Sequence, residues 1–219
     1  MTTQTIGEIS LNVSTFLYLI WFVPQLKLTF ERKTTSDLSF WMHALLLLGY
    51  VADFLYGFGR DMAWQYRLVT LCGLSCLLIE HFQFWRYGLE SARARSHFRL
   101  LNFALLALVS FAVYNGVMVS RSKLFYDLAG LISNICWFSF FLPQIIKNFS
   151  NKSVEGLSTS FVVISILSGI CDVISAFALN WDWPSKMGAP IGLGKKFLLL
   201  SQIFYYRKKS YYSAQAVKI

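Results

Sequence analysis

The segment Phe22-Val-Pro-Gln-Leu26 recurs 119 residues later as Phe141-Leu-Pro-Gln-Ile145. Other residues recur at the same offset without a gap. The aligned identities are Phe30 with Phe149, Lys33 with Lys152, Leu38 with Leu157, Ser39 with Ser158, Asp53 with Asp172, Phe58 with Phe177 and Trp64 with Trp183. So many identities at one offset indicate an internal duplication. Because each copy begins in an apolar run, we expect the duplicated unit to be a bundle of membrane helices.

The amino-acid composition is typical of a membrane protein. Apolar residues make up 56% of the chain and charged residues 14%, with a mean hydropathy of +0.51. Soluble domains average about 45–50% and about 25% for these two fractions. The net charge of +9 is spread between the apolar runs instead of forming one basic face, so a nucleic-acid partner is not expected. The lipid bilayer is the expected surroundings.

Apolar segments long enough to cross a bilayer occur seven times. They cover residues 11–29, 38–59, 65–87, 98–119, 125–147, 157–179 and 190–207. The predicted fold class is therefore an all-α integral membrane protein with seven transmembrane helices. The two triplets have the same orientation because one unduplicated helix separates them (3+1+3). The expected divisions are an outer amino terminus (1–10), a first three-helix bundle (11–87), a linker with helix four (88–124), a second bundle (125–207) and a cytosolic tail (208–219).

Basic residues between the spans predict the orientation, since cytosolic loops carry an excess of Lys and Arg. One side holds Lys27, Arg32, Lys33, Arg86, Arg93, Arg95, Arg99, Lys147, Lys152, Arg207, Lys208, Lys209 and Lys218. The other holds Arg60, Arg67, Arg121, Lys123 and Lys186, with Lys195 and Lys196 at the edge of the last span. We therefore expect the amino terminus outside or in a lumen, and the carboxy terminus in the cytosol.

The repeated Pro-Gln pair lies near one end of a span in each half. Proline removes a backbone donor and disturbs the preceding helical turn, so Pro24 and Pro143 are candidate hinges of a cytosolic gate. Static kinks are the alternative. Gln25 and Gln144 carry amides that either bond backbone groups freed by the prolines or close the gate.

These motifs resemble the PQ-loop repeat family. The first copy continues as Lys33-Thr-Thr-Ser-Asp-Leu-Ser39, and the second as Lys152-Ser-Val-Glu-Gly-Leu-Ser158. The resemblance implies a seven-helix fold like that of SWEET transporters. It also implies kinship with lysosomal and vacuolar exporters of cystine and cationic amino acids, many of them proton-coupled. The expected location is a lysosomal or vacuolar membrane in a eukaryote and the inner membrane in a bacterium.

Two acidic residues, Asp53 and Asp172, fall inside spans at equivalent positions. An ionised carboxylate there is costly, so each is expected to face a cavity, to be protonated or to have a partner. Lys195 and Lys196 lie at a depth where one could neutralise Asp172. Asp53 has no such lysine, and it is the candidate that carries a coupled proton. A purely structural role, with hydrogen bonds across helices, is the alternative.

Asn134 in the fifth span is a candidate substrate ligand or an interhelical contact. Trp137 and Tyr18 are equivalent positions and either line a substrate cavity or pack in the core. Lys195 and Lys196 are further substrate candidates. Glu80 and His81 lie near the cytosolic interface, where we expect their polar ends to reach water or to pair with a charged neighbour.

The sequence therefore predicts a transporter of a small polar solute, an amino acid, that works by alternating access and is coupled to protons. A receptor or trafficking scaffold on the same fold and a sugar uniporter of the SWEET type are the alternatives. An enzyme is not expected, because no nucleophile and base group together; neither a cofactor nor a metal is expected. Oligomeric state stays open.

Overall fold

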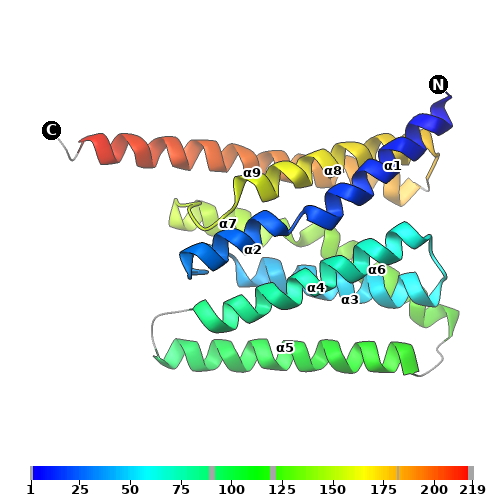
Figure 1. The fold of residues 1–219 in the computed structure, drawn as a ribbon, viewed down its shortest axis with the longest axis horizontal. Coiled ribbons are helices and arrows are strands. Elements are labelled where there is room, and N and C mark those ends of the chain that lie inside the picture. Colours follow the sequence, from blue (N-terminus) through cyan, green and yellow to red (C-terminus); the bar gives the residue numbers. More distant parts are fainter. Residues whose placement is uncertain (1, 89–91, 119–121, 182, 217–219) are drawn as a thin grey trace.

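The computed structural model describes residues 2–88, 92–118, 122–181 and 183–216, and every regular element in these ranges is an α-helix. The elements are α1 (Thr3–Ile20), α2 (Val23–Arg32), α3 (Phe40–Gly59), α4 (Trp64–Tyr87), α5 (Ala92–Met118), α6 (Lys123–Ser139), α7 (Phe141–Asn151), α8 (Thr159–Ala178) and α9 (Trp183–Ala216). The helices run roughly side by side, and the two ends of the chain lie at opposite ends of the bundle (Figure 1).

Each Pro-Gln pair follows a break in a long helix. Pro24 lies in the first turn of α2, where a missing backbone N–H costs nothing. The break before it is a turn at Phe22, whose carbonyl accepts from the backbone N–H of Gln25 at 3.0 Å. In the second half, α6 ends at Ser139 and α7 begins at Phe141, shortly before Pro143.

Backbone conformation repeats at the same offset as the sequence. Among the described residues, positive φ outside glycine occurs at Lys33 and Lys152, which end α2 and α7, and at Asp61 and Asn180, which follow α3 and α8. Each pair is separated by 119 residues, and the φ values all lie between 49° and 52°. Asp and Asn tolerate this left-handed region through local hydrogen bonds, whereas for lysine it is strained. The duplication is thus visible in local geometry.

Helices of one half of the chain pack on helices of the other half. The largest contacts between the halves join α1 to α8 and α3 to α6. Within the first half α4 packs on α1, α2 and α3, and within the second half α9 packs on α6, α7 and α8. Helix α5 packs on α3 and α4, at the edge of the bundle (Figure 1). Aromatic rings fill the centre: Trp21 is fully buried and stacks on Phe161 with ring centroids 5.0 Å apart.

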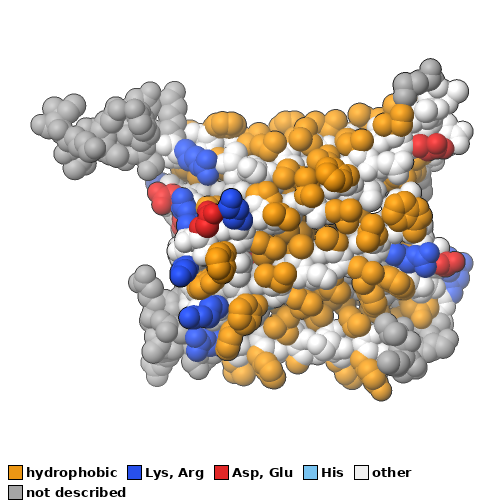
Figure 2. Space-filling view, in the orientation of Figure 1, with side chains coloured by type: hydrophobic (Ala, Val, Ile, Leu, Met, Phe, Trp, Pro, Cys, Tyr) orange, Lys and Arg blue, Asp and Glu red, His pale blue; other side chains and the backbone are white. Residues whose placement is uncertain are grey.

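Five helical segments of the described chain are long and apolar enough to cross a membrane. They are Thr3–Arg32, Phe40–Gly59, Trp64–Tyr87, Lys123–Asn151 and Thr159–Ala178. The segment expected as span four lies in α5 and that expected as span seven lies in α9. Figure 2 shows an apolar band across the middle of the molecule, with charged side chains gathered at the two ends. Arg121 and Lys218 lie outside the described residues, as do the side chains of Arg93, Arg95, Lys208 and Lys209.

Candidate functional site

The Gln25 side chain binds the backbone of the other half of the molecule. Its Oε1 accepts from the N–H of Ser158 at 2.8 Å, and its Nε2 donates to the carbonyl of Gly156 at 3.0 Å. Ser158 is the N-cap of α8, and its own hydroxyl accepts from Phe161 N–H at 3.3 Å. The amide also donates to Thr29 Oγ1, one turn along α2, at 3.2 Å. Gln25 is completely buried.

Gln144 repeats every one of these contacts in the opposite direction. Its Oε1 accepts from the N–H of Ser39 at 2.7 Å, and its Nε2 donates to the carbonyl of Asp37 at 2.9 Å. Ser39 is the N-cap of α3. The turn of α7 that carries Gln144 is held by a bond from Nε2 to Asn148 Oδ1 at 2.7 Å. We call the two sets, Gln25 with Gly156 and Ser158 and Gln144 with Asp37 and Ser39, the glutamine latches.

The latches distinguish between the two roles that the sequence left open for the glutamines. Neither amide bonds to backbone groups freed by its own proline; each bonds to the loop and helix start of the opposite half. A second cross-half contact supports the Gln144 latch, because Lys147 Nζ donates to the carbonyl of Leu38 at 2.7 Å. Both glutamines therefore join the two halves of the chain.

Asp53 belongs to a second set of contacts between the halves. It lies farther along α3, away from the end at Ser39 that Gln144 binds. Its Oδ1 accepts from the hydroxyls of Tyr66 on α4 and Ser133 on α6. Its Oδ2 accepts from the indole N–H of Trp137 on α6 at 2.7 Å. The residue is only 7% exposed, so it is buried among helices. Three donors satisfy a carboxylate that has no basic partner within ion-pair distance in the described chain.

Asp172 makes the matching contacts from α8 to α1. Its carboxylate accepts from the hydroxyls of Ser14 and Tyr18, the latter at 2.6 Å. Ser14 and Tyr18 are the equivalents of Ser133 and Trp137 at the 119-residue offset. Each aspartate therefore bridges to a serine and an aromatic residue one turn apart on the first helix of the other half.

The expected ion pair between Asp172 and a lysine is wrong. Lys196 is buried but donates to the carbonyl of Ser165 at 2.7 Å. Lys195 donates to the carbonyl of Phe138 and lies over that ring, 4.0 Å from its centroid. Backbone carbonyls of neighbouring helices therefore satisfy both ammonium groups, and hydroxyls satisfy Asp172.

The other sequence candidates separate into two groups. Tyr18 and Trp137 both serve as hydrogen-bond donors to the aspartates, and Trp137 also lies 6.2 Å from the Trp21 ring, centroid to centroid. Asn134 is exposed on α6, beside the buried Ser133 that reaches Asp53. The structure thus brings Asp53, Trp137 and the Asp172–Tyr18 pair to the interface between the halves, and leaves Asn134 outside these contacts.

Several residues of the site were not predicted from the sequence. Ser14 and Ser133 are identical at the repeat offset, so this signal was present in the sequence. Tyr66 aligns with Ser185, so the duplication gives no signal for it. Glu80 and His81 were expected to reach water or to pair with a charged neighbour. Both are completely buried, so neither reaches water, and Glu80 lies 3.1 Å from His43 Nε2.

Comparisons with known proteins point to one family. The family model described as PQ loop repeat matches residues 6–66 and 125–185, one match in each half. A vacuolar histidine transporter of Saccharomyces cerevisiae is 34% identical over 101 residues, covering 46% of this chain and 34% of that protein. A vacuolar lysine transporter of the same yeast is 41% identical over 89 residues, covering 37% of this chain and 29% of that protein. The matches therefore span about a third of these relatives.

The fold is also found in a solved structure. The structure of a eukaryotic SWEET transporter superposes with a TM-score of 0.64 at 17% identity, covering 94% of this chain and 99% of that one. At this identity the likeness concerns the fold alone. One family match lies in each of the two halves, and together the matches cover more than half of the chain. This chain belongs to the PQ-loop repeat family.

Proposed function

We propose that this protein is a membrane transporter for an amino acid, working by alternating access between two three-helix bundles. The first bundle consists of α1–α2, α3 and α4, and the second of α6–α7, α8 and α9, with α5 as the linker in a 3+1+3 arrangement of seven spans. One observation carries the proposal. The two halves are held together by polar contacts at two levels, the glutamine latches near one end and the aspartate bridges toward the other.

Polar contacts of this kind suit gates. A hydrogen bond exchanged with water changes the free energy by only about 0.5–1.5 kcal/mol, so contacts at one level can open while those at the other persist. Breaks in the helix before Pro24 and Pro143 place a flexible joint next to each latch. Opening the latches exposes the cytosolic side, and opening the aspartate bridges exposes the outer side. The prolines act as the hinges of the cytosolic gate.

The site favours a cationic amino acid. Asp53 and Asp172 place two carboxylates at the interface, and neither is neutralised by an ion pair in the described chain. A positively charged substrate complements such a site. The named relatives transport histidine and lysine, which agrees with this charge. The proposed location is a vacuolar or lysosomal membrane in a eukaryotic host and the inner membrane in a bacterium.

Uptake by proteoliposomes tests the function. With the outside more acidic than the inside, we expect purified protein to accumulate labelled histidine or lysine above the level of protein-free liposomes. Labelled glucose serves as the comparison for a SWEET-like uniporter and is expected to give no signal. Failure to move any amino acid with or without a gradient would contradict the transporter assignment and favour a receptor or scaffold.

The proposed orientation can be checked with single cysteines in a background in which the four native cysteines are replaced by alanine. Glu155 and Asp61 are both exposed and lie at opposite ends of the bundle. In intact cells or vacuoles, we expect an impermeant maleimide applied from the cytosol to label Glu155→Cys, with at least about tenfold less labelling of Asp61→Cys. The reverse pattern would refute the excess of basic residues as the determinant of topology.

A further inference from the structure

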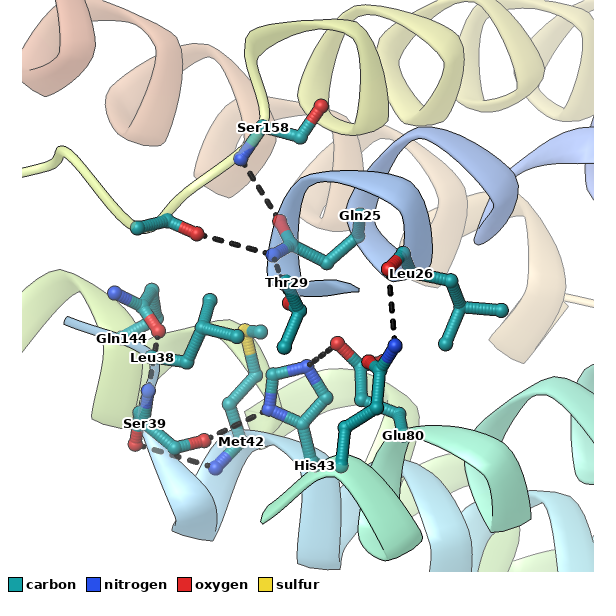
Figure 3. Close-up of polar contacts among 12 residues, drawn as sticks. Gln25, Leu26, Thr29, Leu38, Ser39, Met42, His43, Glu80, Gln144 and Ser158 are labelled. Carbon is teal, nitrogen blue, oxygen red and sulfur yellow. Dashed lines mark hydrogen bonds and ion pairs between the residues drawn. The ribbon is translucent and has the colours of Figure 1, made fainter. Parts of the chain in front are cut away.

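A buried acid–base pair lies beside one of the two latches. His43 on α3 and Glu80 on α4 are both completely buried, and His43 Nε2 lies 3.1 Å from Glu80 Oε1 (Figure 3). The other imidazole nitrogen, Nδ1, lies 2.9 Å from the carbonyl oxygen of Ser39. Apart from this ion-pair contact, His43 Nε2 and both carboxylate oxygens of Glu80 have no hydrogen-bond partner among the residues that the structure describes.

Hydrogen-bond chemistry fixes how many protons this pair holds. A carbonyl oxygen only accepts, so His43 Nδ1 carries a hydrogen. In the neutral imidazole Nε2 would then be a bare lone pair, and it would face a carboxylate in a dry site. That arrangement is repulsive, and burial of the unpaired charge adds to its cost. The pair therefore holds one proton between His43 Nε2 and Glu80, as imidazolium with carboxylate or as imidazole with carboxylic acid.

Few other titratable groups face the pair. His81 and Cys76 approach it from α4. His81 Nδ1 lies 2.6 Å from Asn102 Oδ1 on α5, and Asn102 Nδ2 donates to the carbonyl of His81 at 2.9 Å. Because the Asn102 amide nitrogen is used as a donor, its oxygen accepts from His81. His81 Nδ1 is thereby held by a structural contact with α5, whereas its buried Nε2 has no hydrogen-bond partner among the described residues.

The charged groups of the adjoining segments are engaged elsewhere. From α7, Lys147 donates to the carbonyl of Leu38. Asp37 in the preceding loop accepts from Ser153 Oγ at 3.2 Å. On α2, Lys27 and Glu31 are exposed and lie 3.8 Å from each other. No Lys or Arg of the described chain forms an ion pair with Glu80, so His43 is its partner.

Contacts lead from this pair to the Gln144 latch. The carbonyl of Ser39 accepts from His43, and the N–H of the same residue donates to Gln144 Oε1 (Figure 3). Ser39 is thus a single residue that touches the protonated pair on one side and the opposite bundle on the other. Moving Ser39 away from Gln144 also moves the group that orients His43.

The second half of the molecule has no such pair. The equivalents of His43 and Glu80 at the 119-residue offset are Val162 and Leu199, both completely buried. Two apolar side chains therefore fill the same place beside the Gln25 latch, and the fold does not need a polar pair there. Since a buried ion pair is weak evidence for stability, its presence beside only one latch indicates another role.

We propose that the His43–Glu80 pair is a proton-binding site that controls the cytosolic gate through Ser39 and Gln144. The pair keeps its proton while the latch is closed and dry. When the latch opens, water reaches the pair and the proton leaves for the cytosol, which makes this a second proton site, separate from Asp53. The inference rests on the proposed function only in taking the latches as a gate.

The direction of the pH effect follows from the proton count. The open conformation binds one proton fewer than the closed one, so raising the cytosolic pH favours opening. A difference of one proton changes the ratio of open to closed molecules by up to about tenfold per pH unit. Leu38, which precedes Ser39, is 1% exposed and therefore a sensitive position for a probe of opening.

The test measures labelling of Leu38→Cys by an impermeant maleimide in the cysteine-free background. Rates at each pH are normalised to the same cysteine in denatured protein, which removes the reactivity of the thiol itself. We expect normalised labelling to rise with pH by up to about tenfold per unit. The labelling does not measure transport, so its outcome is independent of whether the protein moves amino acids.

Two variants locate the effect. His43→Val with Glu80→Leu copies the second half of the molecule and should remove the pH dependence. Glu80→Gln supplies a permanent amide hydrogen to His43 Nε2, so labelling should stay low at every pH, and this variant decides the matter if the double variant does not fold. An unchanged pH response in the variants would assign it to another group such as His81 and overturn the proposal, as would a wild-type protein whose labelling does not vary with pH.

Discussion

Accumulation of substrate against a gradient is expected to disappear when Asp53 is replaced by asparagine. With one proton coupled to each solute molecule, a pH gradient of one unit sustains about tenfold accumulation, since a factor of ten corresponds to about 1.4 kcal/mol. In the Asp53→Asn variant, the ratio of substrate inside to substrate outside should fall to the value that the substrate reaches without help from the pH gradient. The measurement is steady-state uptake in proteoliposomes with and without an imposed pH gradient.

The geometry around Asp53 makes asparagine a close copy of the protonated acid. Trp137 donates to Oδ2 and its indole nitrogen cannot accept, so a proton on this carboxylate belongs on Oδ1. Oδ1 faces the hydroxyls of Tyr66 and Ser133, which can turn from donors into acceptors. The asparagine amide group can donate to the same two hydroxyls while its oxygen still accepts from Trp137. The variant should therefore fold, but it cannot release a proton.

Asp172→Asn is the matched control, because it makes the same chemical change at the equivalent position. Asp172 is more exposed than Asp53 and has two hydroxyl donors instead of three partners. Because the coupled proton is assigned to Asp53 alone, the pH response should persist in Asp172→Asn. Gradient-driven accumulation by Asp53→Asn equal to that of the wild type would refute the assignment of the proton to this carboxylate.

A second large effect is expected at the glutamine latches. Gln144→Ala leaves the backbone N–H of Ser39 and the carbonyl of Asp37 without the amide that now binds them, and Gln25→Ala does the same to Ser158 and Gly156. An unpaired buried group costs about 1–3 kcal/mol. Opening the latch lets water satisfy both groups, so each variant should raise the open population by about tenfold or more.

Maleimide labelling of two equivalent positions checks this expectation. Leu38→Cys reports the latch of Gln144, and Leu157→Cys, at the same place in the repeat, reports that of Gln25. Gln83→Ala is the control, because Gln83 is also a buried amide that donates to a backbone carbonyl, that of Leu26 at 3.0 Å, but within its own bundle. Equal labelling in the latch variants and in Gln83→Ala would show that the effect is general destabilisation.

The internal repeat predicts much of the architecture. The offset of 119 residues, measured between the Pro-Gln pairs, also relates the helix breaks, the left-handed caps at Lys33 and Lys152, and the partners of the aspartates. Ser14 and Ser133 could have been found by asking which identical polar residues share that offset. His43 and Tyr66 could not be found in this way, nor could the burial of Glu80, because the two halves differ at those positions and nothing in their spacing indicates burial.

By itself, the sequence determined that the chain is a duplicated helical membrane protein, because hydropathy and a gap-free repeat are properties of residues along the chain. It did not determine the partners of those residues. The pairing of α1 with α8 and α3 with α6 brings each glutamine to the opposite loop, satisfies Asp172 with hydroxyls instead of a lysine and buries Glu80 against His43. These partners lie up to 158 residues apart, and only helix packing decides which side chains from distant segments share a dry interface.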